Sequence, residues 1–259
     1  MIEIDIGITR SDLRLRVPAS ENSLPLVRQA LRSVGETVDA DLNALEDAEL
    51  AVTEAMANAV EHAYEGEDGE VRVTLDPMES ELMVVVSDDG RGIPEDFQRR
   101  EGRGFGLSMI QGIAEKLELR GGDGTDVSMT FAMGRSETET VDGGTPGIEP
   151  AERLLRRLVA VVAAQLDMAS DRVFEALLVA ELVARNSLRY LTGETAVVSL
   201  APAGGGFELR VGPLEHGGGQ AAVDDSDVPV VGRVLERLTD ATAVEPGEDG
   251  AETLMLRIS

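Results

Sequence analysis

The sequence predicts an α+β protein built from two tandem two-layer α/β sandwiches, each with helices on one face of a mixed, mostly antiparallel sheet. Residues 136–150 (SETETVDGGTPGIEP) are rich in Gly, Pro, Ser, Thr and acidic residues and show no apolar periodicity, which is typical of a linker. The same order of helical and strand patterns occurs on both sides of this segment, and each side is long enough to fold alone. We therefore expect a first domain at 1–135, a linker at 136–150 and a second domain at 151–259.

The first half contains both kinds of apolar periodicity. Apolar residues alternate where we expect strands and recur every three or four residues where we expect helices. Ser20 or Ser23 is suited to cap the first helix, and Pro25 falls in its first turn. In chain order the expected elements are strands at 2–8 and 13–17, helices at 24–34 and 41–64, strands at 71–75 and 81–87, glycine-rich loops at 88–106, a helix at 107–117 and two short strands flanking the turn at 121–124.

The second half repeats this order and indicates an internal duplication. Pairing FELRVGPLEHGGG with SELMVVVSDDGRG places Glu215 opposite Asp88 and Gly217 opposite Gly90. The second half lacks a strand before its first helix, whereas the first half has a spare one at 2–8. We expect this spare strand to join the second sheet or the junction between the halves. The expected elements are helices at 151–167 and 171–191, strands at 196–200 and 207–211, a helix at 230–239 and a strand at 253–258.

The composition excludes several classes of function. The net charge is −26, which disfavours binding to nucleic acid or to an anionic membrane surface. The absence of Cys removes thiolate catalysis, and Lys116, the only lysine, does not follow a glycine-rich phosphate loop. Neither His62 nor His216 has the setting of a phosphoacceptor histidine. No apolar run spans a bilayer and no signal pattern opens the chain, so we expect a cytoplasmic protein.

The helical stretch EAMANAVEHAY carries the first candidate chemistry. Glu54 and Asn58 are four residues apart and project from the same helix face. A glutamate is a candidate acid or base, and an amide oxygen suits Mg²⁺. An exposed pair that only solvates the helix is the alternative that the spacing leaves open.

Three glycine-containing turns follow this helix. The first, DDGRG at 88–92, comes directly after an apolar strand, so that Asp88 can read an exocyclic amine while the glycines let a flat ring approach the backbone. The second, GRGFGL at 102–107, opens a helix whose free N–H groups suit phosphate. The third is Gly124-Thr125, which leads into a strand. No βαβ unit precedes the second turn, which argues against a dinucleotide-binding fold.

In this order and spacing, the four elements resemble the Bergerat ATP-binding fold of gyrase, Hsp90 chaperones, histidine kinases and MutL. The E-A-x-x-N-A-x-x-H-A-Y helix and the short loop between the glycine turns are similar to those of the anti-sigma-factor serine/threonine kinases. The resemblance covers roughly residues 11–134. It implies ATP and Mg²⁺ as cofactors, Glu54 as catalytic base and Asn58 as metal ligand. It also implies that Asp88 binds the adenine amine and that Thr125 supports Asp88 through water.

The resemblance also assigns the glycines. Gly90 and Gly92 shape the adenine pocket, and a lid at about 93–106 covers the phosphates. Arg99 and Arg100 either add positive charge there or are solvated, and Phe105 is expected to anchor the lid rather than stack on the base. His62 receives no role, and Asp89 is expected to be a solvated neighbour. The residues expected around the phosphates are Gly102, Arg103, Gly104, Phe105, Gly106 and Leu107.

The second half lacks this constellation. Its long helix offers Ala180 with Ala184, Glu181 with Arg185, or Leu182 with Asn186 in place of the Glu/Asn pair, and its sequence has no counterpart of GRGFGL. We expect a degenerate copy that no longer binds ATP and that stands in for a second protomer in an intramolecular pseudo-dimer or holds partner specificity.

The resemblance implies an ATP-dependent anti-sigma factor that phosphorylates an anti-anti-sigma (STAS-type) protein and sequesters a sigma factor. An alternative is a nucleotide-gated protein-binding module without significant phosphotransfer. A slow ATPase driven by lid motion is a third possibility, which the short lid disfavours.

Overall fold

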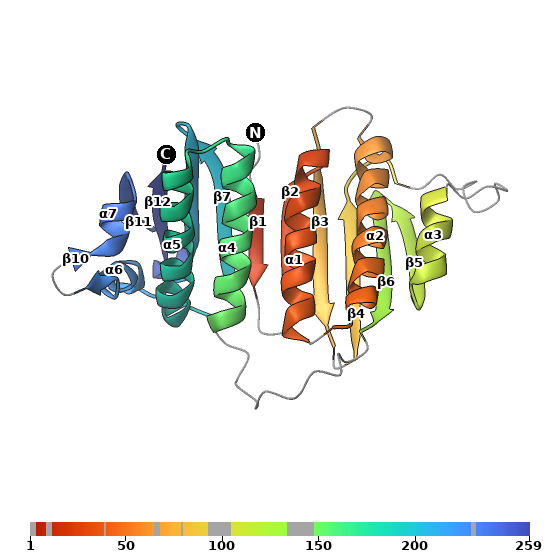
Figure 1. Ribbon diagram of the computed structural model, residues 1–259, viewed down its shortest axis with the longest axis horizontal. Helices are drawn as coiled ribbons and strands as arrows, with labels where there is room; N and C mark the ends of the chain where they lie inside the picture. The colour runs from red at the N-terminus through yellow and green to blue at the C-terminus, as the bar shows by residue number, and fades with distance from the viewer. Residues whose placement is uncertain are drawn as a thin grey trace. The chain divides into compact units, whose positions relative to one another are not determined.

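The computed structural model describes residues 4–8, 12–38, 40–64, 68–78, 80–92, 105–133, 148–228 and 232–259 (Figure 1). The chain divides into two compact units, Ser11–Gly143 and Gly144–Ser259, and the second of these also includes Met1–Arg10. The first ten residues thus lie in a different unit from the one that the sequence predicted. Most of the expected linker lies outside the described residues, and its last three residues, 148–150, begin a helix.

The first unit contains a five-stranded sheet. Each described pairing between neighbouring strands is antiparallel, which is the limiting case of the mostly antiparallel sheet that we expected. In sheet order the strands are β2 (Leu13–Pro18), β3 (Glu70–Pro77), β4 (Glu81–Asp88), β6 (Gly124–Ala132) and β5 (Lys116–Gly122).

Helices cover one face of this sheet (Figure 1). They are α1 (Leu24–Thr37), α2 (Leu42–Asn58), which continues into a π-helical turn (Ala59–Ala63), and α3 (Phe105–Ile113). Alternate residues of the strands are buried, and Val73 in β3 and Val84 in β4 are as fully buried as Leu31 and Met56 of the helical layer. Burial of one such side chain stabilises the fold by about 1.5–3 kcal/mol.

Both boundaries expected for the third helix of the first unit are wrong, and α3 begins at Phe105 rather than at residue 107. The helix expected at 107–117 ends at Ile113, because the backbone N–H of Glu115 donates to Thr130 O and Leu117 pairs with Met129 in β5. The strand expected at 13–17 and the helix expected from residue 41 lie where the sequence placed them. Asp41 caps α2, since its carboxylate accepts from the N–H groups of Asn43 and Ala44.

The second unit has its own five-stranded antiparallel sheet. In sheet order its strands are β1 (Ile4–Ile8), β7 (Ala196–Ala203), β8 (Gly206–Leu214), β12 (Glu252–Ile258) and β11 (Ala241–Pro246). The long helices α4 (Ile148–Gln165) and α5 (Ser170–Ser187) cover one face (Figure 1). The shorter elements are α6 (Gly218–Asp224), α7 (Val234–Leu238) and a small ladder of β9 (Asp227–Val228) with β10 (Gly232–Arg233).

The two units share one topology. The strand order β2-β3-β4-β6-β5 corresponds step by step to β1-β7-β8-β12-β11. In both units two long helices lie between the first and the second strand along the chain. The spare strand at the start of the chain therefore completes the second sheet, where Ile6 pairs with Val198, which confirms one of the two placements that we expected. The first unit is thus inserted between the first strand and the first helix of the second unit.

The second unit also departs from the predicted boundaries. The helix α5 ends at Ser187 rather than at residue 191, α7 covers only part of the expected 230–239, and α6 and β11 were not predicted. None of the helices in the described part of the chain has the length and hydropathy that a membrane span requires.

Candidate functional site

Helix α2 presents Glu54 and Asn58 on one half-buried face. Its other face, with Ala48, Ala51 and Val52, is fully buried and fixes the rotation of the helix against the sheet. The predicted pair therefore cannot turn away from its position without exposing this core. The alternative, an exposed pair that only solvates the helix, does not fit the half-buried environment of both side chains.

Gly106 brings α3 against this pair. A Cβ at Gly106 would lie 2.6 Å from Glu54 Oε2 and 3.6 Å from Asn58 Nδ2. Both predicted side chains therefore face the same point in the first turn of α3. The backbone N–H groups of a first helical turn have no intrahelical partner and favour anions, so the carboxylate, the amide and an anion-binding helix end meet here.

Asp88 ends β4 in a buried position, with 7% of its surface exposed. Burial raises the pKa of the Asp88 carboxyl, while hydrogen bonds from the Gly90 N–H (2.9 Å) and from Thr125 oppose the rise. Thr125 is paired with Asp88 across β4 and β6, which places it beside the carboxylate that it is expected to support. The carboxylate keeps acceptor capacity for a further donor.

Gly90 and Gly92 are required by the packing of the protein's own backbone. A Cβ at Gly90 would lie 2.4 Å from Ala63 O, and Gly92 has φ +68° with Gly122 O at 2.3 Å from a Cβ. These glycines let the loop after β4 lie against the end of the π-helical turn and against β5. The loop is therefore closely packed, and this packing sets the position of Asp88.

The remaining predicted residues are described only in part. Gly102, Arg103 and Gly104, with Arg99, Arg100 and most of the lid at 93–106, lie outside the described residues. Phe105 begins α3, but its side chain is not described, and Leu107 is half-buried in the same turn.

Sequence reasoning missed three residues around this loop. Asp89 is exposed, as expected, but it also forms a two-pronged ion pair with Arg72, with Nη2–Oδ1 at 2.7 Å, and the hydrogen bond from Arg72 lowers the pKa of Asp89. Tyr64 contacts the loop through the N–H of Asp89, and Arg91, within the loop, donates to His62 O. Tyr64 belongs to the motif EAMANAVEHAY and Arg91 to DDGRG, so the motifs contained these residues but did not indicate their roles.

A metal fits this site only with help from its ligand. Among the described residues no group of three or more His, Asp or Glu side chains is arranged to hold a metal. Asn58 offers one amide oxygen, and Mg²⁺ is commonly held by one or two protein groups together with substrate phosphates. The residues present therefore suit a phosphate-bridged Mg²⁺ rather than a metal held by protein alone.

The equivalent helix of the second unit keeps the asparagine but not the glutamate. The buried residues Ala48, Ala51, Val52, Ala55 and Met56 of α2 recur in α5 with the same spacing as Ala176, Val179, Ala180, Val183 and Ala184. This match places Leu182 opposite Glu54 and Asn186 opposite Asn58. Asn186 is buried, and its Nδ2 donates to Ala222 O at 3.3 Å in α6.

The sheet positions differ as well. Val86 pairs with Val127 and Asp88 with Thr125, while in the second unit Val211 pairs with Leu254 and Leu214 with Glu252. Leu214, fully buried, thus stands where Asp88 stands, and the expected pairing of Glu215 with Asp88 is wrong by one residue. The expected pairing offset the two strands by two residues, with Val211 opposite Val84 instead of Val86, and the extra residue that β8 holds between Val211 and Leu214 reduces this offset to one.

Glu252, the first residue of β12, bonds the loop after β8 through its side chain. Its carboxylate accepts from the N–H groups of Gly217 (2.8 Å) and Gly219 (3.1 Å) and lies 3.2 Å from His216 Nδ1. The hydrogen bond from Gly217 lowers the pKa of Glu252. In the first unit the equivalent loop is bonded by Asp88 of the preceding strand, whereas here a carboxylate from the neighbouring strand β12 takes this role.

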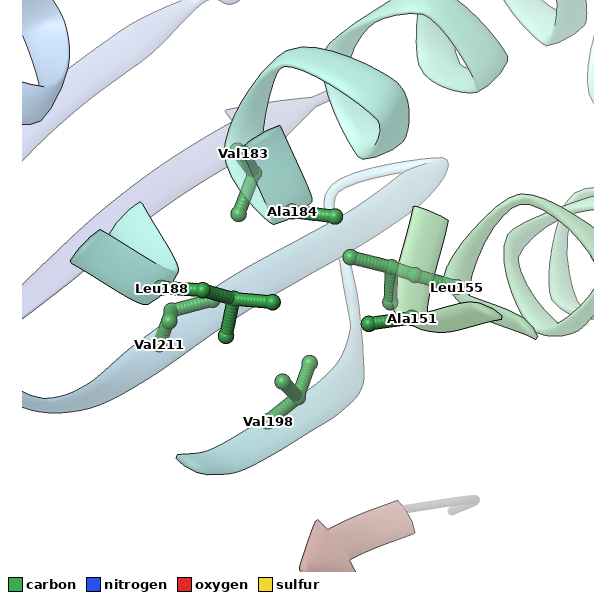
Figure 2. Close-up of a pocket in the computed structure, with 7 residues that line it drawn as sticks. All are labelled: Ala151, Leu155, Val183, Ala184, Leu188, Val198 and Val211. Carbon is green, nitrogen blue, oxygen red and sulfur yellow. The ribbon is translucent and has the colours of Figure 1, made fainter. Parts of the chain in front are cut away.

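A cavity in the second unit is of another kind (Figure 2). It lies between α4, α5 and strands β7 and β8 and is lined by Ala151, Leu155, Val183, Ala184, Leu188, Val198 and Val211. Because all of these side chains are apolar, the cavity is a packing gap in the core and offers a nucleotide no hydrogen bond.

Comparison with known proteins gives the following matches. A histidine kinase-like ATPase domain model matches residues 17–131. The serine-protein kinase RsbW of Bacillus pumilus is 29% identical over 147 residues, which cover 49% of this chain and 89% of that protein. RsbW of Listeria innocua is 30% identical over 142 residues, covering 49% and 90%. Among solved structures, the histidine kinase domain of the Erythrobacter litoralis EL346 blue-light activated histidine kinase aligns with a TM-score of 0.33 and 26% identity, over 45% of this chain and 62% of that one, a likeness too partial to bear on function.

Proposed function

This chain belongs to the family of the serine-protein kinase RsbW, through its histidine kinase-like ATPase domain, and we propose that it is an ATP-dependent anti-sigma factor that phosphorylates an anti-anti-sigma protein and sequesters a sigma factor. The observation that carries the proposal is the convergence of Glu54 and Asn58 on Gly106 at the start of α3. A carboxylate and an amide beside a helix N-terminus suit phosphoryl transfer, in which positioning and charge stabilisation do most of the work.

Each described group has one role in the proposal. Asp88 accepts a hydrogen bond from the exocyclic amine of adenine, and Thr125 holds the Asp88 carboxylate in place. The first turn of α3 faces the phosphates. Asn58 would hold Mg²⁺, which would supply positive charge against the phosphates. Glu54 accepts the proton of the substrate Ser or Thr hydroxyl, whose oxygen bonds to the γ-phosphorus as the bond to ADP breaks.

The second unit, in this proposal, does not bind nucleotide. Leu182 removes the base, Leu214 removes the adenine acceptor, and Glu252 saturates loop N–H groups with a carboxylate. An incoming nucleotide would meet two apolar side chains and a fixed negative charge. The unit retains the fold of the first, and we assign it a role in binding protein partners.

The test is phosphotransfer from radiolabelled Mg-ATP to the cognate anti-anti-sigma (STAS-type) protein. Glu54→Gln should retain ATP binding and lower kcat by about 10²–10⁴, because a general base contributes this much. Glu181→Gln, on the equivalent helix of the second unit, is the matched control and should leave kcat unchanged. Normal ATP binding without transfer in the wild-type chain would overturn the kinase and favour a nucleotide-gated binding module.

A further inference from the structure

The loop that carries Asp88 is held by the end of helix α2. Beyond Asn58 this helix widens into the π-helical turn Ala59–Ala63, and Tyr64 follows directly. Single π-helical turns inside α-helices occur often at functional sites, because the extra residue redirects the side chains after it. Here the turn places Tyr64 in contact with the loop at 88–92.

Tyr64 joins two strands of the site through one hydroxyl group. The hydroxyl donates to Glu70 O at 2.6 Å, where β3 begins, and accepts from the N–H of Asp89 at 3.0 Å, directly after β4. The ring lies so close to Gly69 that a Cβ there would come within 2.4 Å of ring carbons. The ring is therefore fixed between the chain before β3 and the loop after β4.

Other contacts hold the loop against the same turn. The N–H of Arg91 donates to Ala63 O at 3.1 Å, and Arg91 Nη2 donates to His62 O at 3.2 Å. The ion pair of Arg72 with Asp89 holds the exposed side of the loop. Of these groups only Tyr64 contacts the backbone N–H of Asp89, the residue that adjoins the buried carboxylate of Asp88.

We infer that Tyr64 is a positioning residue for nucleotide recognition, which acts by fixing the Asp88 carboxylate in position to accept a hydrogen bond from the adenine amine. The inference rests on the proposed function, since it needs Asp88 to read adenine. A hydroxyl that bonds the peptide after Asp88 restricts the rotation of that peptide and hence the direction of the Asp88 side chain. Its loss leaves the pocket formed but the acceptor less well aligned.

The second unit contains the natural counterpart. The chain has two tyrosines, and Tyr190 follows Asn186 by four residues where Tyr64 follows Asn58 by six, because α5 ends in a 3₁₀ turn instead of a π-helical one. The Tyr190 hydroxyl donates to Asp225 Oδ2 at 2.9 Å, at the end of α6. The unit without the adenine acceptor thus also lacks the hydroxyl contact to the loop backbone.

The test measures the Kd of ATP and of ITP, whose base lacks the exocyclic amine, for Tyr64→Phe and for the matched control Tyr190→Phe. Removing one hydrogen bond should raise the Kd of ATP about threefold to tenfold in Tyr64→Phe and leave the Kd of ITP nearly unchanged. The preference for ATP over ITP should therefore fall. The KM for ATP should rise while kcat is retained. Tyr190→Phe should behave as the wild-type chain does.

The outcomes separate this inference from the function on which it rests. A general loss of structure in Tyr64→Phe would weaken the binding of ATP and of ITP equally, and this result would overturn the positioning role. An unchanged ATP preference in Tyr64→Phe would overturn it as well. A wild-type chain that does not prefer ATP to ITP would instead refute the proposed adenine contact of Asp88 and, with it, this inference.

Discussion

Gly106 controls the distance between α3 and the pair Glu54 and Asn58. The space beside it is filled by Glu54 Oε2, 2.6 Å from the position of a Cβ. Because the contact is with the end of a flexible side chain, Gly106→Ala would displace the carboxylate rather than the helix. Alanine also favours a helix over glycine by about 1 kcal/mol, so activity and stability are expected to move in opposite directions.

We predict that Gly106→Ala lowers kcat of phosphotransfer by about tenfold to a hundredfold, as a misplacement near 1 Å can do, while the midpoint of thermal unfolding stays the same or rises. Gly112→Ala in the same helix is the control, since a Cβ there meets nothing within 4 Å. It should raise stability similarly and leave kcat intact. Equal activity of the two variants would show that Glu54 tolerates displacement and is not the base.

Single residues were predictable where a motif fixed their neighbours and less so where backbone geometry intervened. The pair Glu54 and Asn58 follows from helical spacing, and Asp88 from its place after an apolar strand. The counterpart of Asp88 was misassigned to Glu215 because the ungapped comparison offset the two strands by two residues, of which the extra residue in β8 removes only one. The role of Tyr64 depends on a π-helical turn, which apolar periodicity does not reveal.

At the scale of elements, β1 is the most informative finding. Alternating isoleucines predicted the strand itself, and the missing strand before α4 indicated where it was needed. Short elements without such patterns escaped prediction: α6 begins in a glycine run, and β11 (ATAVEP) has too few apolar residues to distinguish it from a loop. Their formation depends on pairing with β12 and packing in the second unit.

Removal of residues 1–10 should therefore affect the second unit and not the nucleotide site. We predict that a chain of residues 11–259 unfolds at lower urea concentration, because β7 loses one of the two strands with which it pairs. The free energy of unfolding should fall by about 1–3 kcal/mol. Amide exchange should accelerate in β7 and remain slow in β3 and β4. ATP should bind with unchanged affinity.

A synthetic peptide of residues 1–10 provides the control for this truncation. Added in trans, it should restore slow exchange in β7, since the edge of the sheet remains available. Unchanged stability of the truncated chain, or weakened ATP binding, would contradict the assignment of β1 to the second unit.

At the scale of the whole molecule, the net charge of −26 opposes the binding of a polyanion such as ATP. Exposed charges farther away than about 8 Å are screened at physiological ionic strength. In the proposed site, nucleotide affinity therefore depends on three groups: the N–H donors of the first turn of α3, the amide oxygen of Asn58, which would hold the metal, and the carboxylate of Asp88, which would accept from the base. A unit with the same fold but without these groups has nothing to offset the repulsion.

The same groups determine how many nucleotides one chain binds. Calorimetric titration with Mg-ATP should yield one nucleotide per chain, because Leu182, Leu214 and Glu252 close the second site. Asp88→Asn should lower the affinity for Mg-ATP by an order of magnitude or more. Glu252→Gln should leave this affinity unchanged, since Glu252 belongs to the other unit. Two binding events per wild-type chain would refute the assignment of the second unit. A single event that survives Asp88→Asn but is lost in Glu252→Gln would place the nucleotide in the wrong half of the molecule for every role proposed here.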